Sequence, residues 1–328
     1  MKTLKIGLVG VGGMGSVHYA NYKEIDGCEV AAVVGHSARA KQTAEKWGVP
    51  CFDTITAMVN AVDVDVVDIC TPTYTHHDMV MESLACKKNT ICEKPIALSY
   101  NDAKEMLDEA DRQGVHLYVA QVLQYTKEVG FLRRAVESGE FGKPLDACFE
   151  RLSACPNWAK DGWLFDVNKS GLLPYDLHIH DLDIIVSLFG KPESFTYTSC
   201  QGDGKDYPEQ FRVNYNYGRL NVVGEAAWFN ADIPWTARWR VYFENGMLIN
   251  DGSKLTAYRF GKEPYVYDTA DEVMVSTGIN VPPCGWYYNE LKAFLQNVRD
   301  NKPAENVTRE QLLTVMELLE EISAPWRK

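Results

Sequence analysis

The sequence has no apolar run of about 18 residues, so we expect no membrane-spanning helix. No basic cluster offsets the net charge of −12, which argues against binding to nucleic acid or to an anionic membrane. The nine cysteines include no C-x-x-C pair, and Cys70 and Cys92 lie in apolar runs, as small buried hydrophobes do. The N-terminus lacks a signal peptide's long apolar segment and cleavage site. Together these absences predict a cytoplasmic protein.

The composition is typical of a globular protein, and the length favours two domains. The 328 residues are 46% apolar and 24% charged. In the first third of the chain, short β-rich apolar runs alternate with helical patterns, which predicts a doubly wound parallel sheet. The expected strands are Lys5–Val9, Glu29–Val34, Val64–Cys70, Thr90–Cys92 and Val115–Ala120.

One helix in this region is marked at both ends. Ser99 opens an S-Y-N-D capping box, apolar residues follow at helical spacing, and Gly114 stops the pattern. Later in the chain, a strand-rich stretch from Glu193 to about Asp268 includes a hairpin turn at ENG, and two helices close the sequence. We place one domain at residues 1–122 and a second at 123–328, whose last helices could pack back on the first.

The first expected strand runs into a G-x-G-x-x-G turn that is followed by a helical pattern. Such glycines keep the turn tight and let the backbone approach a pyrophosphate, whose charge then lies at a helix N-terminus. A glycine-rich turn without a ligand is the alternative. The turn residues expected to bind a dinucleotide are Gly10, Val11, Gly12, Gly13, Met14 and Gly15.

The residues after the second strand bear on cofactor choice. NAD sites usually have an acidic residue there to hold the ribose hydroxyls, but this chain has Gly35, followed by His36, Ser37 and Arg39. Without the carboxylate a 2′-phosphate is not repelled, and Ser37, His36 or Arg39 could bind it. We lean toward NADP, or use of both cofactors; the alternative is NAD bound through other contacts.

The loop after the third expected strand should border the same ligand. Thr71 and Pro72 lie at its carboxyl end, where open α/β sheets bind ligands, and His76 follows. A metal site at His76 and His77 is disfavoured, because adjacent side chains on a helix point about 100° apart.

A second chemically rich stretch is DLHIHDLD, which begins at Asp176 within an expected helix, Asp176–Phe189. On a helix, Asp176, His180 and Asp183 share one face. A histidine flanked by carboxylates suits a general base. A polar surface stripe and a metal site are the alternatives.

Residues 89–99, NTICEKPIALS, place Lys94 between Glu93 and Pro95 at the end of a strand. Lys94 is either a solvated charge or a catalytic amine. Because X–Pro bonds admit the cis form at modest cost, a cis Lys94–Pro95 bond is a hypothesis for the structure.

Together these motifs resemble the Gfo/Idh/MocA family, the glucose–fructose oxidoreductase and inositol dehydrogenase type of pyridine-nucleotide enzymes. The resemblance rests on the glycine turn with His18 beyond it, TPTYTH from Thr71, EKP from Glu93, Ser170-Gly171, and DLHIH from Asp176, in the family's order. It implies a Rossmann domain followed by an α/β domain with a large, mostly antiparallel, open-faced sheet.

The resemblance also implies roles. Lys94 and His180 would be the catalytic pair and Asp176 their partner at the substrate, while Glu93 and Trp163 would lie at the cofactor site. Two departures affect specificity: Gly35 replaces the acidic residue, and Gln124 stands where members often have an arginine.

We therefore expect an NAD(P)-dependent dehydrogenase or reductase that acts on a sugar, inositol or related polyol. A glycosidase or epimerase that retains its nicotinamide, and a non-catalytic nucleotide sensor, are the alternatives. An exposed sheet face suggests a homodimer or homotetramer.

Overall fold

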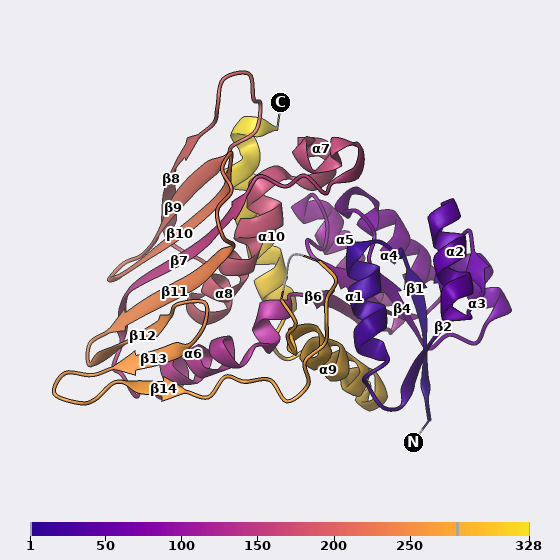
Figure 1. Ribbon diagram of the computed structural model, residues 1–328, viewed down its shortest axis with the longest axis horizontal. Coiled ribbons are helices and arrows are strands. Elements are labelled where there is room, and N and C mark those ends of the chain that lie inside the picture. The colour runs from indigo at the N-terminus through magenta and orange to yellow at the C-terminus, as the bar shows by residue number, and fades with distance from the viewer. Residues whose placement is uncertain (1, 280–281, 328) are drawn as a thin grey trace. The chain divides into compact units, whose positions relative to one another are not determined.

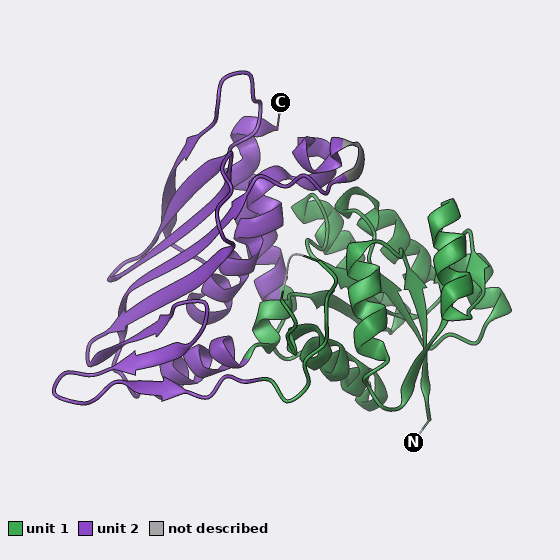
Figure 2. Cartoon of the chain, viewed as in Figure 1, with its two compact units in different colours: residues 1–126, 271–309 green, residues 127–270, 310–328 purple. Residues whose placement is uncertain are grey.

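The protein is described here by a computed structural model that covers residues 2–279 and 282–327. It forms two compact units (Figure 2): Met1–Thr126 with Asp271–Arg309, and Lys127–Ala270 with Glu310–Lys328. The chain leaves the first unit after Thr126, near the expected boundary at 122/123. It returns with residues 271–309, which the sequence alone places in the second domain.

The first unit contains the predicted doubly wound sheet, with six parallel strands in the order β3-β2-β1-β4-β5-β6 (Figure 1). The order reverses between β1 and β4, and the carboxyl ends of strands at such a reversal are where this architecture binds ligands. The elements are β1 (Leu4–Val9), α1 (Gly13–Tyr22), β2 (Cys28–Val34), α2 (Ala38–Trp47), β3 (Cys51–Phe52), α3 (Ile55–Ala61), β4 (Val66–Ile69), η1 (Thr73–Thr75), α4 (His76–Ala85), β5 (Asn89–Glu93), α5 (Tyr100–Gln113), β6 (Leu117–Ala120), η2 (Val122–Tyr125) and α9 (Trp286–Asp300).

Local sequence signals account for most of these elements. All of β4 is buried, as expected for a parallel strand covered on both faces. Helix α5 confirms the predicted cap, because Ser99 Oγ accepts the Asp102 N–H at 3.0 Å and Gly114 ends the helix with φ 69°. Strand β3 was not predicted, because its two residues are too few to form a pattern.

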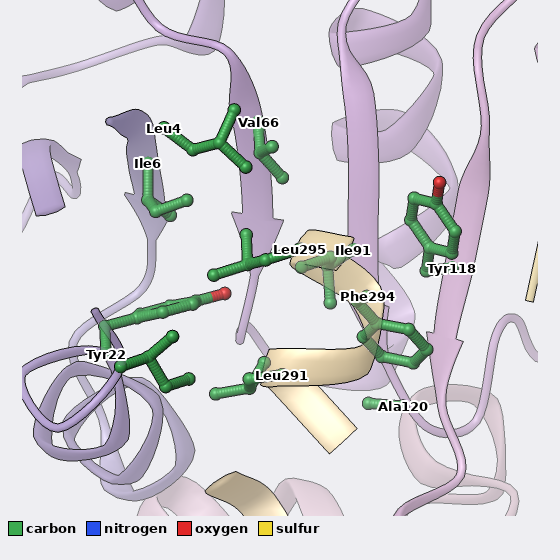
Figure 3. Packing of buried hydrophobic residues seen from close by; sticks show 11 residues of the cluster. Leu4, Ile6, Tyr22, Val66, Ile91, Tyr118, Ala120, Leu291, Phe294 and Leu295 are labelled. Carbon is green, nitrogen blue, oxygen red and sulfur yellow. The ribbon is translucent and has the colours of Figure 1, made fainter. Parts of the chain in front are cut away.

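Helix α9 belongs to the first unit because its apolar stripe packs on this sheet. Leu291, Phe294 and Leu295 share one cluster with strand residues such as Ile6 and Ile91 (Figure 3). All five side chains have 0% exposure. Burying each such side chain stabilises the fold by about 1.5–3 kcal/mol before entropy is counted.

The second unit is built on an eight-stranded sheet in the order β14-β13-β12-β11-β7-β10-β9-β8, in which only the β7–β10 pair is parallel among the described strands. This confirms the predicted large, mostly antiparallel sheet. The elements are α6 (Lys127–Ser138), β7 (Pro144–Ala154), η3 (Lys160–Phe165), α7 (Val167–Ser170), η4 (Pro174–His178), α8 (Ile179–Phe189), β8 (Ser194–Cys200), β9 (Gln210–Tyr217), β10 (Leu220–Phe229), β11 (Thr236–Phe243), β12 (Gly246–Asn250), β13 (Leu255–Tyr258), β14 (Tyr265–Tyr267), α10 (Arg309–Ser323) and η5 (Ala324–Trp326).

One face of this sheet is covered by helices and the other is not. Helices α6, α8 and α10 lie along one face, and no described helix covers the opposite one (Figure 1). In β9 and β11 buried and exposed residues alternate, as in a sheet with one solvated face. The predicted ENG hairpin is confirmed by the pairing of Phe243 with Gly246 across the turn. Of the helices in the described part of the chain, none is long and apolar enough to cross a membrane.

Candidate active site

The glycine turn joins β1 to α1, and two of its glycines are required by close approaches of the backbone. Gly10 has φ +88°, and a Cβ there would lie 2.8 Å from the Cys70 carbonyl oxygen. A Cβ on Gly15 would lie only 2.0 Å from the Gly10 carbonyl oxygen. The turn can therefore close only with glycine at both positions.

The other two glycines face open space. A Cβ on Gly12 would meet no described atom within 4 Å, and one on Gly13 would meet only Ile279, at 3.4 Å. Gly12 is the N-cap of α1, and no side chain caps this helix end. Gly12 has no side chain with which to cap the first N–H groups of this helix, which suits an anion such as a pyrophosphate there. Val11 and Met14 pack into apolar clusters, so their side chains support the turn.

The end of β2 carries no acidic residue, as the sequence indicated. Ser37 is the N-cap of α2, and its Oγ accepts the Ala40 N–H at 3.1 Å. Arg39 is exposed in the first turn of this helix. One carboxylate is nearby: Asp53 lies 3.6 Å from His36 Nδ1, and both side chains are exposed.

The loop after β4 is held by hydrogen bonds. Thr75 Oγ1 donates to Thr71 Oγ1 or to the Pro72 carbonyl, each at 2.8 Å. His76 is buried, with its ring nitrogens 2.7 Å from the Pro95 carbonyl oxygen and 2.8 Å from that of Thr71. Burial lowers the pKa of His76, and the two carbonyl contacts oppose that shift. His76 therefore ties the loops after β4 and β5 together, while its predicted cofactor contact stays a prediction.

Lys94 follows β5 and stands out by its exposure. From Thr90 to Ala97, a stretch described throughout, Lys94 is the one residue that is not buried. Its backbone N–H donates to Glu93 Oε2 at 3.0 Å. The Lys94–Pro95 bond is cis, which confirms that hypothesis.

In the second unit, Asp176 and His180 show the same kind of exposure. Between Gly171 and Val186, a stretch also fully described, these two residues alone are partly exposed. The helix differs from the expected one: residues Pro174–His178 form a π-helical turn, and α8 begins only at Ile179. Such turns often occur at functional sites. Asp183 is buried and accepts a hydrogen bond from Gln311 Nε2 at 2.6 Å. It therefore lies in the interior of the second unit, unlike Asp176 and His180.

Two buried polar contacts hold this helix on its sheet, and the sequence analysis missed both. Arg151 of β7 donates to both carboxylate oxygens of Asp181, at 2.7 and 3.1 Å. His178 Nε2 lies 2.7 Å from the Tyr215 hydroxyl, and a Cβ on Gly224 would lie 2.4 Å from the His178 ring. Burial lowers the pKa of His178 to about 3, so its ring is neutral in the folded protein.

Trp163 lies in η3 and is partly exposed, while Gln124 is buried in η2.

Among the described residues, two groups bring three possible metal ligands within 4.8 Å: His18 with Asp68 and Cys70, and His77 with Asp102 and Glu105. Neither group contains a residue of the DLHIHDLD stretch. In the first group, His18 Nδ1 lies 2.8 Å from Asp68 Oδ2, a hydrogen-bond distance. Two ligand atoms of a tetrahedral zinc ion would be about 3.3 Å apart. The shorter distance between His18 Nδ1 and Asp68 Oδ2 therefore fits a hydrogen bond better than shared coordination of zinc.

Comparison with known proteins gives two family matches. Residues 4–121 match the family described as "Oxidoreductase family, NAD-binding Rossmann fold", and residues 130–249 match "GFO/IDH/MocA C-terminal domain".

The chain is 26% identical to myo-inositol 2-dehydrogenase of Thermotoga maritima, over 92% of this chain and 90% of that protein. It is 33% identical to rhizopine catabolism protein MocA of Rhizobium meliloti, over 70% of this chain and 75% of that protein. Among solved structures, an oxidoreductase from Agrobacterium radiobacter in complex with NAD+, L-tartaric acid and magnesium has a TM-score of 0.83 at 18% identity, covering 98% of this chain and 97% of that one. This last likeness concerns the fold.

Proposed function

The chain belongs to the Gfo/Idh/MocA family of oxidoreductases, and on that premise we propose that it transfers hydride between NAD(P) and a secondary alcohol or ketone of a sugar, inositol or related polyol. The observation that carries the proposal is the exposure pattern of two segments. Lys94 is the one residue that is not buried between Thr90 and Ala97 in the first unit. Asp176 and His180 are the two that are not buried between Gly171 and Val186 in the second. Partly exposed lysine, histidine and aspartate side chains of this kind are candidates for acid–base roles at a substrate.

The chain's own residues divide the task. The open N-terminus of α1, with Gly12 and Gly13, would hold the pyrophosphate, and Thr71, Pro72, Glu93 and Trp163 would complete the cofactor site. Bound NAD(P) would supply the hydride acceptor or donor. The Lys94 ammonium would stabilise negative charge developing on the substrate hydroxyl oxygen, and the His180 imidazole would take its proton, with Asp176 contacting the substrate.

The part of the cofactor site proposed for the adenosine ribose would also admit a 2′-phosphate, so we propose that NADP is used as well as NAD. Ser37 and the exposed Arg39 offer a hydroxyl and a guanidinium, and Gly35 offers no carboxylate to repel the phosphate. The charge of Asp53, 3.6 Å from His36 Nδ1, opposes this proposal. A cytoplasmic location is likewise proposed, in keeping with nine free thiols.

The test is a panel of polyols and aldoses, assayed with each cofactor by NAD(P)H absorbance. We expect turnover on at least one of them, and an NADP affinity within tenfold of the NAD affinity. A stronger NAD preference would contradict the NADP proposal. Net turnover of free cofactor also separates a dehydrogenase from an enzyme that retains its nicotinamide.

The Lys94→Ala variant tests the catalytic assignment. Losing the ammonium should lower turnover by about 10²–10⁴-fold while cofactor binding persists, because the glycine turn is untouched. Lys104→Ala is the matched control, since Lys104 is an exposed surface lysine paired with Asp108. Near-normal turnover of Lys94→Ala would remove Lys94 from the mechanism.

A further inference from the structure

A buried charge cluster lies beside Lys94 in the first unit. His18 of α1 and Asp68 of β4 have 0% exposure, and Glu93 at the end of β5 has 7%. His18 Nδ1 is 2.8 Å from Asp68 Oδ2, and His18 Nε2 is 3.0 Å from Glu93 Oε1. Ionised carboxylates accept hydrogen bonds and donate none, so this geometry is satisfied when both ring nitrogens carry protons.

The environment supports that cationic form. Burial by itself would lower the pKa of His18, but the charge of Asp68, followed by its neighbour Cys70 and the hydrogen bond to Asp68, raises that pKa well above the ordinary value. The Tyr22 hydroxyl donates to the same oxygen, Asp68 Oδ2, at 2.8 Å, which adds a second hydrogen bond to this carboxylate. His18 is thus a buried cation bridging two carboxylates on neighbouring strands.

This bridge reaches the backbone of Lys94. Glu93 Oε1 faces His18, and its other oxygen, Oε2, accepts the Lys94 N–H at 3.0 Å. On the far side of Lys94, the Pro95 carbonyl oxygen lies 2.7 Å from His76 Nδ1. The residues before and after Lys94 are therefore each held by a buried histidine, while Lys94 itself stays accessible.

We propose that His18 is a positioning residue for Lys94: as a cation it locks the Glu93 carboxylate, which holds the backbone from which the catalytic amine extends. The inference rests on the proposed function, because it takes Lys94 as the group that acts on substrate. His18 touches neither substrate nor cofactor in this role. Its loss should therefore disturb the chemical step more than binding.

The test uses His18→Gln, which keeps one donor but removes the cation. We expect kcat to fall about 10–100-fold, with the KM of the substrate and the Kd of NADH, measured by fluorescence, within about threefold of the parent. In a Lys94→Ala background the same substitution should change kcat by less than about twofold, because its effect passes through Lys94. A purely structural role would lower turnover in both backgrounds.

His77→Gln is the matched control. His77 also has its two ring nitrogens near carboxylates, those of Asp78 and Glu105 at 3.1 and 3.3 Å, but its side chain is 31% exposed and neither carboxylate belongs to the His18 cluster. It should keep the parent kcat. If His18→Gln fails to fold, Asp68→Asn provides the same measurement, since it keeps the size of the side chain and removes the charge that holds His18 as a cation.

The outcomes separate the two proposals. Full turnover of Lys94→Ala would overturn the role of Lys94, and with it the positioning role. Loss of turnover in Lys94→Ala, but a kcat within twofold of the parent in folded His18→Gln and Asp68→Asn, would overturn the positioning role alone. Equal losses in the two backgrounds would show that His18 supports the fold generally.

Discussion

Gly12 and Gly15 belong to the same turn, yet a methyl group should act differently at each. In Gly15→Ala the new Cβ would lie 2.0 Å from the Gly10 carbonyl oxygen, so the backbone must shift. Such overpacking costs about 1–3 kcal/mol and should lower the Tm measured by thermal denaturation. In Gly12→Ala the Cβ meets no described atom, so the Tm should stay close to that of the parent.

The same Gly12 methyl would occupy the space where the pyrophosphate is proposed to lie. We therefore expect Gly12→Ala to weaken NADH binding by at least about tenfold, measured by fluorescence titration. Parent-like affinity in this variant would show that the turn does not face the cofactor.

At the residue scale, sequence could locate groups that belong to contiguous motifs. Gly10–Gly15, Lys94 and the Asp176–His180 pair were proposed from short patterns, and their roles stay predictions. The partners of His18 were not, because Asp68 and Glu93 are 50 and 75 residues away along the chain. One signal was available: Asp68 is a carboxylate within VVDIC, a strand buried on both faces, and such a charge requires a partner.

At the scale of elements, capping residues and apolar stripes predicted helix positions well. The π-helical turn at Pro174–His178 was not predicted, since the sequence pattern indicated a regular 3.6-residue period through Asp176. The irregular turn is accompanied by the buried polar contact between His178 and Tyr215, formed by a helix and a strand far apart in sequence. Contacts of this kind depend on tertiary packing that no local pattern contains.

His178 should make the stability of the protein depend on pH. Its pKa is about 3 in the folded protein, because of burial and then the charge of Arg151, against about 6.5 in the unfolded chain. Between these values the unfolded state binds a proton that the folded state excludes, so stability is full above about pH 6.5 and falls as pH drops. The loss is about 1.4 kcal/mol per pH unit well below pH 6.

Urea unfolding at pH 7 and pH 5 measures this effect. The parent should lose more free energy of unfolding between the two values than His178→Asn, whose neutral amide can still reach toward Tyr215. His18 acts in another range: its raised pKa gives stability that is full below about pH 6.5 and is lost as pH rises through the folded value. Parallel losses in the parent and in His178→Asn would contradict a buried neutral histidine.

At the scale of the whole molecule, sequence correctly predicted two architectures, a parallel sheet followed by a mostly antiparallel one. It could not assign segment 271–309 to one of the two units, because the apolar face of an amphipathic helix does not show which sheet the helix packs against. Helix α9 could have covered either sheet, and only the packing of Leu291, Phe294 and Leu295 shows which one it covers.

The uncovered face of the eight-stranded sheet leads to the last prediction, that the protein is a homo-oligomer. Ion pairs join neighbouring strands on this face: Arg212 with Glu225, Arg238 with Glu150, and Arg240 with Asp146. We propose that two copies associate through it, since a two-fold interface presents the same patch twice and alternating charges can complement themselves. Light scattering should give at least twice the chain mass of 37.0 kDa.

Arg238→Glu should weaken this association. The reversal sets a second carboxylate beside Glu150 on both copies, so we expect the dissociation constant of the oligomer to rise at least about tenfold with the circular dichroism spectrum unchanged. Arg112→Glu is the matched control, because Arg112 is also an exposed arginine paired with a glutamate, Glu109, but lies on α5. A parent that has the mass of one chain at every concentration, or equal weakening by both reversals, would show that this sheet face is not the interface.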